Sequence, residues 1–173
     1  MTTIHFFAEE GCKGASSGPV KQDVPNLSSV GFLQRAKSLR VSGNPCIVFK
    51  EKDFKGNFAL FQEGDCDSLG EFSEAISSVR VVKGGLRDPE ITVYEHINYG
   101  GKATTLTSPT PNLNSYEMNN MISSHKVTKG AWRLYEKEDY DGSCIVALAG
   151  DNLDSYLSIG WNDTVNSLKP YKP

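Results

Sequence analysis

The feature that most constrains this sequence is a fourfold repeat of one short aromatic and glycine pattern. In its clearest copy, Tyr94 is followed five positions later by Tyr99 and two positions after that by Gly101. The other copies are Phe7, Cys12 and Gly14; Phe49, Phe54 and Gly56; and Tyr135, Tyr140 and Gly142. Their first residues lie 42, 45 and 41 positions apart, a period in the range of stacked supersecondary units. The chain therefore contains four related folding units.

Each copy predicts a hairpin that folds back over its own sheet. Such a turn needs a backbone position with positive φ, and glycine fills it because it has no Cβ. The aromatic ring is then expected to lie flat against the glycine backbone. Short apolar runs such as 47–50, 91–94 and 132–135 are bounded by turn residues, as strands are. Because no long window has a helical period, the sequence predicts an all-β protein.

The four repeats are expected to pair into two domains. A repeat of about four strands cannot bury both faces of its sheet alone, whereas two repeats can pack sheet on sheet. Residues 83–89, Lys-Gly-Gly-Leu-Arg-Asp-Pro, interrupt the strand pattern midway along the chain. We therefore predict domains at 1–86 and 87–173. The alternative is a four-bladed propeller, but the glycine and proline break follows two repeats and not each one.

Composition argues against a nucleic-acid or anionic-membrane partner. The 173 residues carry a net charge of −3, without a basic footprint. All of the acidic excess lies in 87–173, with eight basic and eleven acidic side chains. The N-terminus has neither a basic start nor a long apolar core, and no later run reaches membrane-spanning length. We expect a cytoplasmic protein, a monomer or weak homodimer, whose four cysteines are free thiols rather than disulfides.

The octets at 49–56, 94–101 and 135–142, their period and their pairing resemble the βγ-crystallin superfamily. The end of repeat four, which contains Trp161, adds to the resemblance, which covers essentially the whole chain. It implies two Greek-key β-sandwich domains with two Greek-key motifs each, as in two-domain invertebrate members. Repeat one departs most from the pattern, because Cys12 stands where an aromatic is usual.

The resemblance also points to calcium. Residues 119–124 read Asn-Asn-Met-Ile-Ser-Ser and residues 162–167 read Asn-Asp-Thr-Val-Asn-Ser. They match the family's calcium pattern of two Asn or Asp, two variable residues, Ser or Thr, and Ser, and oxygen donors of this kind suit a hard cation. In the family each ion is held by loops of both repeats and a hairpin carbonyl. The implied metal residues are Glu95, Asn119, Asn120, Met121, Ser123, Glu136, Asn162, Asp163, Thr164 and Asn166.

One competent and one impaired site are expected in the second domain. The competent site would combine Ser123 and carbonyls of its own loop with the carboxylate of Asp163. In repeat four Asn166 replaces the ligating hydroxyl, and a carboxamide that reached an ion would place its oxygen differently. A single carboxylate predicts modest affinity, on the order of 10⁻⁵–10⁻³ M. Asn and Ser are also ordinary turn residues, because their side chains bond neighbouring backbone groups.

The first domain is expected to be calcium-silent. Its corresponding stretches are 33–38, Leu-Gln-Arg-Ala-Lys-Ser, and 73–78, Ser-Glu-Ala-Ile-Ser-Ser. Lys37 stands at the hydroxyl position and places an ammonium where a dication would bind. Glu74 and Ser77 remain usable, but a shared site needs the other loop as well.

Catalysis finds little support in the sequence. The three histidines fall at unrelated places in the repeats, and Cys144 lies in an apolar run typical of a buried, inert thiol. We expect a non-enzymatic structural protein stabilised by calcium. The alternative is an interaction or binding module without a functional calcium site, such as an assembly subunit or a glycan- or membrane-recognising relative. That alternative predicts an exposed apolar or aromatic patch.

Overall fold

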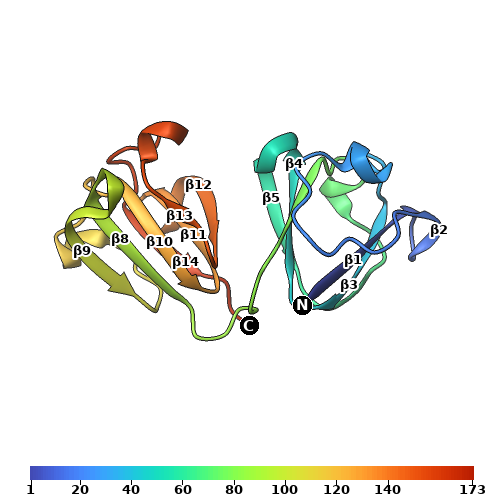
Figure 1. Ribbon diagram of the computed structural model, residues 1–173, viewed down its shortest axis with the longest axis horizontal. Coiled ribbons are helices and arrows are strands. Elements are labelled where there is room, and N and C mark those ends of the chain that lie inside the picture. Colours follow the sequence, from blue (N-terminus) through green and yellow to red (C-terminus); the bar gives the residue numbers. More distant parts are fainter. The chain divides into compact units, whose positions relative to one another are not determined.

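In the computed structural model, which describes residues 1–173, the chain forms two units, Met1–Lys83 and Gly84–Pro173 (Figure 1). The division falls inside the segment 83–89, which interrupts the strand pattern. Each unit contains two antiparallel sheets that enclose an apolar core, so the predicted all-β sandwich class is confirmed. None of the helices has the length and apolar character needed to cross a bilayer.

The first unit has a four-stranded sheet in the order β2-β1-β3-β6 and a three-stranded sheet in the order β5-β4-β7. The bounds of its strands are β1 (Thr2–Glu9), β2 (Lys13–Ser16), β3 (Ser38–Gly43), β4 (Cys46–Glu51), β5 (Lys55–Phe61), β6 (Gly64–Cys66) and β7 (Ser78–Val81). β6 belongs to repeat two but pairs with β3 of repeat one. In the other direction, Val24 of repeat one bridges Val79 of β7. Both sheets therefore depend on both repeats.

The second unit repeats this plan, with sheets in the orders β13-β10-β8-β9 and β12-β11-β14. The bounds of its strands are β8 (Glu90–His96), β9 (Gly100–Leu106), β10 (Ser124–Lys129), β11 (Ala131–Lys137), β12 (Asp141–Leu148), β13 (Asn152–Leu153) and β14 (Ser167–Pro170). Here β13 of repeat four pairs with β10 of repeat three, and Thr110 bridges Leu168 of β14. The same exchange of strands thus joins the second pair of repeats.

The helices are single 3₁₀ turns. Three lie inside the folded hairpins: η2 (Lys52–Phe54), η4 (Ile97–Tyr99) and η6 (Glu138–Tyr140). Four precede the last strand of a repeat: η1 (Leu27–Val30), η3 (Gly70–Phe72), η5 (Leu113–Tyr116) and η7 (Tyr156–Ile159). Leu27, Leu113 and Tyr156 each open such a turn and are buried in the core.

A buried serine holds each folded hairpin. The Ser124 hydroxyl donates to the carbonyl of His96 at 2.7 Å and accepts the Tyr99 N–H at 3.1 Å. Ser38, Ser78 and Ser167 make the same two bonds in the other repeats. All four serines are fully buried. The last serine of each loop pattern is therefore a structural lock, because its hydroxyl is fully used by the hairpin.

The four hairpin glycines have positive φ, as predicted. Gly101 has φ of +73°, and a Cβ there would lie 2.5 Å from Cδ2 of His96 and 2.8 Å from Oε1 of Glu95. The nearest atoms thus belong to side chains at the end of β8. The ring of Tyr99 packs edge-on against Tyr94, with centroids 5.5 Å apart. Aromatic pairs favour this edge-to-face geometry because of their quadrupoles.

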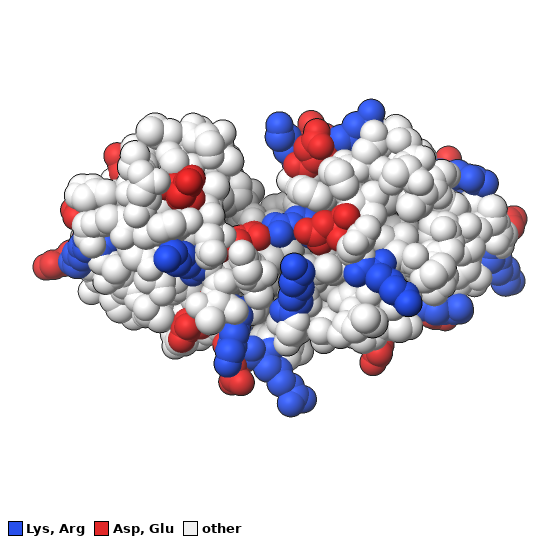
Figure 2. All heavy atoms as spheres, viewed as in Figure 1, with Lys and Arg blue, Asp and Glu red and all other residues white.

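Charged side chains of both signs are interspersed on each unit. On the face shown in Figure 2, neither sign gathers into a broad patch. All four cysteines are unpaired, and Cys46 is fully buried, which raises the pKa of its thiol to about 12. Its thiol therefore stays protonated and packs as a small apolar group.

Candidate metal centre

The loops 119–124 and 162–167 meet in the second unit. Asn120 and Asp163 occupy equivalent places in the two loops, and both have left-handed backbone, with φ of 56° and 55°. Gln34 and Glu74 have the same conformation at the equivalent places in the first unit. The Asp163 N–H donates to the carbonyl of Ile122 at 3.1 Å. This bond fixes one loop against the other. The two loops also meet at two junctions, one on each side of this bond.

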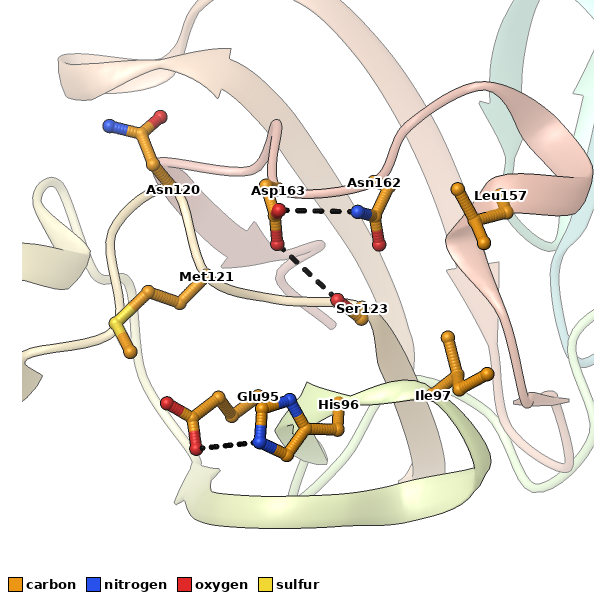
Figure 3. A pocket seen from close by; sticks show the side chains of 9 residues that line it. All are labelled: Glu95, His96, Ile97, Asn120, Met121, Ser123, Leu157, Asn162 and Asp163. Carbon is orange, nitrogen blue, oxygen red and sulfur yellow. Dashed lines mark hydrogen bonds and ion pairs between the residues drawn. The ribbon is translucent and has the colours of Figure 1, made fainter.

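The first junction is an open pocket of about 570 Å³. Ser123 lies 3.3 Å from Asp163, measured from the hydroxyl to Oδ1. Asn162 donates to the other carboxylate oxygen at 3.2 Å, and Figure 3 shows this group of side chains facing the pocket. The pocket is lined by Glu95, His96, Ile97, Asn120, Met121, Ser123, Leu157, Asn162 and Asp163.

The donor set of this pocket fits a hard cation. A hydroxyl and a carboxylate from different repeats meet at one place, in a pocket that Met121 and Glu95 also line. Glu95 lies at a register shift of the β8–β9 ladder, as expected of a hairpin that supplies a carbonyl outside the ladder. Its carboxylate is used elsewhere, since Oε1 lies 3.4 Å from Nε2 of His96 and accepts the Lys102 N–H at 3.2 Å.

The second junction is filled by the side chain of Asn166. Its Nδ2 donates to the carbonyl of Glu136 at 2.8 Å, to Oδ1 of Asn120 at 2.9 Å and to the carbonyl of Thr164 at 3.3 Å. Its Oδ1 accepts the Asn120 N–H at 3.2 Å. This orientation of the amide is forced, because three oxygens need a donor and one N–H needs an acceptor.

The structure therefore sorts the predicted metal residues into two groups. Glu95, Met121, Ser123, Asn162 and Asp163 line the open pocket. Asn120 also lines it, but its side-chain oxygen accepts a hydrogen bond from Asn166. The main-chain carbonyls of Glu136 and Thr164 accept hydrogen bonds from the same Asn166 amide. Asn119 belongs to neither group. At this junction the NH₂ group of Asn166, and not its oxygen, points at the oxygens of Glu136, Asn120 and Thr164.

The two junctions of the first unit are also bridged by side-chain nitrogens. Nζ of Lys37 lies 3.8 Å from a carboxylate oxygen of Glu74. At the other junction, Nε2 of Gln34 donates to the hydroxyl of Ser77 at 3.4 Å. An ammonium and an amide thus face the oxygens that a cation would need.

A second cluster of potential ligands lies elsewhere in the first unit. The ligand atoms of Cys12, Asp65 and Asp67 all lie within 4.8 Å of one another. However, Arg40 pairs with both oxygens of Asp65, at 2.7 and 3.2 Å. Burial and the nearby Asp65 raise the pKa of the Cys12 thiol, which disfavours the thiolate that a metal needs. This cluster is best described as an ion pair beside a thiol.

The sequence interpretation missed two features near the pocket. Ile97 and Leu157 line its mouth and are 43% and 65% exposed. Ile97 stands where the other three octets carry charged residues, Glu10, Lys52 and Glu138, and this contrast was the available signal. Behind the loops, His125 and Tyr156 form a buried pair, with Nδ1 2.5 Å from the hydroxyl oxygen. Burial lowers the pKa of His125 to about 4.

Two stretches of the chain match one known protein family. The Beta/Gamma crystallin family matches residues 3–82 and 90–171. The Epidermal differentiation-specific protein of Cynops pyrrhogaster is 38% identical over 172 residues, which are 99% of this chain and 50% of that protein. This chain therefore spans half the length of that relative.

Solved structures of the same kind are similar as well. A βγ-crystallin from an archaeon is 35% identical, covers 49% of this chain and 100% of its own, and has a TM-score of 0.46. Geodin, a βγ-crystallin from Geodia cydonium, is 21% identical, covers 98% of this chain and 99% of its own, and has a TM-score of 0.41.

Proposed function

The chain belongs to the beta/gamma crystallin family, in agreement with the resemblance of its repeats, and from this premise we propose that its second domain binds one calcium ion. The proposed ligands are the carboxylate of Asp163, the hydroxyl of Ser123, and the main-chain carbonyls of Met121 and Glu95. The observation that carries the proposal is the approach of Ser123 to Asp163, 3.3 Å apart at the floor of an open pocket. Water would complete the six to eight oxygens that calcium takes.

Each proposed ligand has a distinct task. Asp163 supplies the only full negative charge among the four, and its left-handed backbone aims it from repeat four at repeat three. Ser123 is 5% exposed, so little freedom remains to be lost on binding. In the ion-free protein its proton is directed at Asp163, whereas a bound cation would be met by the lone pairs of the hydroxyl. A calcium ion would supply a positive charge that ties the two loops together.

Binding to the folded state alone stabilises that state. At a calcium concentration about ten times Kd, the gain is roughly 1.4 kcal/mol, from RT ln(1 + [L]/Kd). For a domain of this size that gain raises Tm by about 5–10 °C. With one carboxylate, the expected Kd is on the order of 10⁻⁵–10⁻³ M. Calcium should therefore act as a stabiliser of the second domain at millimolar concentration.

Isothermal titration calorimetry on the full chain stripped with EDTA tests this proposal. We expect one ion per chain, and we expect Asp163→Ala to weaken binding about 100-fold or more because it removes the only charged ligand. Glu74→Ala is the matched control, since Glu74 is the equivalent residue in the first domain and should leave the titration unchanged. Binding that survives Asp163→Ala but is lost in Glu74→Ala would refute the proposal.

A second candidate function is weak self-association through the rim of the pocket. Ile97 and Leu157 are exposed apolar residues on two adjacent turns, and Ile159 of the same turn as Leu157 is 43% exposed. Such a rim suits a second copy of the chain, but it is too small for a stable dimer, which needs about 1,200 Å². Sedimentation equilibrium would detect this association, and Leu157→Ser should abolish it while calcium binding stays unchanged.

The proposed role is structural and non-enzymatic. His125, the buried histidine, is neutral and bonded to Tyr156, and His96 is an exposed side chain beside Glu95. We further propose a cytoplasmic location, where the four unpaired thiols would stay reduced. The activity and partners of any longer protein that contains this chain are a separate question, because the relative from Cynops pyrrhogaster is twice as long.

A further inference from the structure

The first domain carries a cluster of Cys12, Asp65 and Asp67, which forms an ion pair with Arg40 beside a thiol. We propose that this cluster binds a zinc ion, with the Cys12 thiolate and one carboxylate oxygen of each aspartate as ligands. The inference is independent of the proposed calcium site, which lies in the other domain. Its basis is the meeting of sulfur and carboxylate oxygen, both zinc ligands, at one hairpin.

The three ligand atoms already lie near the spacing of a metal site. Sγ of Cys12 and a carboxylate oxygen from each of Asp65 and Asp67 all lie within 4.8 Å of one another. Around a tetrahedral zinc ion, with Zn–S of about 2.3 Å and Zn–O of about 2.0 Å, such atoms are about 3.3–3.5 Å apart. Both aspartates are exposed and Cys12 is half-buried, so rotation of side chains is enough to close the difference. A water molecule would take the fourth position.

The main chain that carries the ligands is fixed by bonds that a metal does not have to form. The Cys12 N–H donates to the buried hydroxyl of Ser38 at 2.9 Å. The carbonyl of Asp67 accepts the N–H of Gly11 at 2.9 Å, and Asp65 lies on β6, which pairs with β3. The hairpin and the β6 segment are therefore held together before zinc binds, and little backbone freedom remains to be lost.

The equivalent place in the second domain lacks two of the three ligands. Tyr99 occupies the hairpin position of Cys12. Asn152 occupies the position of Asp65, because each faces the basic residue two places after the locking serine. The third position is an aspartate in both domains, and its carbonyl accepts a hairpin N–H in each. The first domain thus differs by a thiol for a phenol and a carboxylate for an amide, and both changes add a ligand that zinc prefers.

Arg40 is compatible with zinc at this place. Its guanidinium donates to the two oxygens of Asp65 at 2.7 and 3.2 Å, but each carboxylate oxygen has a second lone pair for the metal. Hydrogen bonds of this kind orient a ligating carboxylate, and Arg40 also lowers the pKa of Asp65, which keeps it ionised. Two carboxylates and one guanidinium leave one net negative charge, which a zinc ion bound to a thiolate neutralises.

Zinc itself ionises the thiol. In the structure, the Cys12 thiol donates to the carbonyl of Leu39 at 3.5 Å. A metal ion deprotonates a thiol that coordinates it, so the proton leaves this hydrogen bond and passes to water. The Cys12 sulfur then donates to no group and has its lone pairs available for the metal.

Cobalt(II) is a suitable probe, because a thiolate ligand gives it a charge-transfer band in the near ultraviolet. The full chain, stripped with EDTA, passed into EDTA-free buffer and kept reduced, should develop this band to one cobalt ion per chain, and zinc should remove it by displacing cobalt. The proposed calcium pocket offers only oxygen ligands, so cobalt bound there would lack the band. Loss of calcium binding in the second domain would therefore leave this result unchanged.

Four variants locate the site, each checked for folding by circular dichroism. Cys12→Ser should abolish the band and weaken zinc binding about 100-fold, whereas Asp65→Asn and Asp67→Asn should each weaken it about 10-fold and keep the band. Cys66→Ser is the matched control, because Cys66 stands between the two aspartates in sequence but packs against the apolar core. Its band should equal that of the wild type.

Three results would overturn the inference. One is a wild type that binds cobalt or zinc without a thiolate band, or binds neither. Another is a band that persists in Cys12→Ser or is lost in Cys66→Ser. The third is zinc binding of wild-type strength in both aspartate variants, because the carboxylates would then not be ligands.

Discussion

The two domains share one scaffold and differ in what bridges the junctions between their loops. Each domain has two hairpins that are held by a buried serine, strands exchanged between its two repeats, and left-handed residues at the same loop positions. In the first domain, Lys37 and Gln34 close both junctions with nitrogen donors. In the second, Asn166 closes one and the other brings Ser123 to Asp163.

This difference shows that the scaffold does not depend on the chemistry of the junctions. The four locking serines are not among the residues that line the open pocket, so a loop can carry a nitrogen in place of an oxygen at the junction while its serine still holds the hairpin. A Lys, a Gln or an Asn at the junction supplies internally the positive charge or dipole that an ion supplies from outside. Ion dependence is then a property of single side chains on a common fold.

The largest expected difference between the domains appears in acid. His125 and Tyr156 stand where repeat one has Leu39 and Leu27. Burial lowers the pKa of His125 to about 4, opposed in part by Asp151, whereas an unfolded histidine takes its proton near pH 6.5. Between these values the unfolded chain binds more protons, so stability is full above pH 6.5 and falls as pH falls toward 4. The loss is about 3 kcal/mol.

Equilibrium unfolding in urea between pH 7 and 4 measures this effect. The control is the double variant His125→Leu, Tyr156→Leu, which restores the residues of the first domain at both positions. Its second domain should lose less stability over the same pH range than the wild type. Equal losses in the two proteins would show that His125 is not responsible.

The next effect tests the shared part of the scaffold. Ser124→Ala and Ser78→Ala each remove a buried hydroxyl that makes two backbone bonds. Each variant should lose about 2 kcal/mol from its own domain, because a carbonyl and an N–H are left unpaired. Urea unfolding should show similar losses in the two domains. A loss confined to the second domain would mean that the scaffold is not equivalent in the two.

A smaller effect is expected from a substitution at a junction of the first domain. Lys37→Ser removes the ammonium that pairs with Glu74 and restores a hydroxyl at the junction. The first domain should then gain a weak calcium site, with Kd on the order of 10⁻³ M. Lys37→Met is the matched control, because it removes the charge without adding an oxygen. Calcium binding by the Met variant would show that removing the charge is enough, and binding by neither variant would contradict the prediction.

Much of this arrangement followed from the sequence, because it is carried by repetition. The octet spacing predicted four hairpins and an all-β sandwich fold, and the family resemblance indicated the two loops that meet in the second domain. The direction of the Asn166 amide could not be predicted, since a carboxamide is donor and acceptor at once and two of its three partners, Asn120 and Glu136, are distant in sequence. The serine lock is a fourfold signal in the sequence, at Ser38, Ser78, Ser124 and Ser167, but the spacing alone does not show that these hydroxyls bond to the hairpin.

The aromatic residues make the two domains optically separable. All eight phenylalanines lie in residues 1–83, whereas all seven tyrosines and both tryptophans lie in residues 84–173. Trp132 is fully buried and Trp161 packs against the core of the second domain. Tryptophan fluorescence therefore follows only the second domain, while far-UV circular dichroism follows both.

The most direct test is a pair of thermal melts of the full chain, one in EDTA and one in millimolar calcium, followed by both signals. The transition seen by tryptophan fluorescence should rise by about 5–10 °C in calcium, and the remaining transition seen by circular dichroism should stay where it is. A rise of both transitions by the same amount, or a rise only of the one that fluorescence does not see, would contradict a calcium site confined to the second domain.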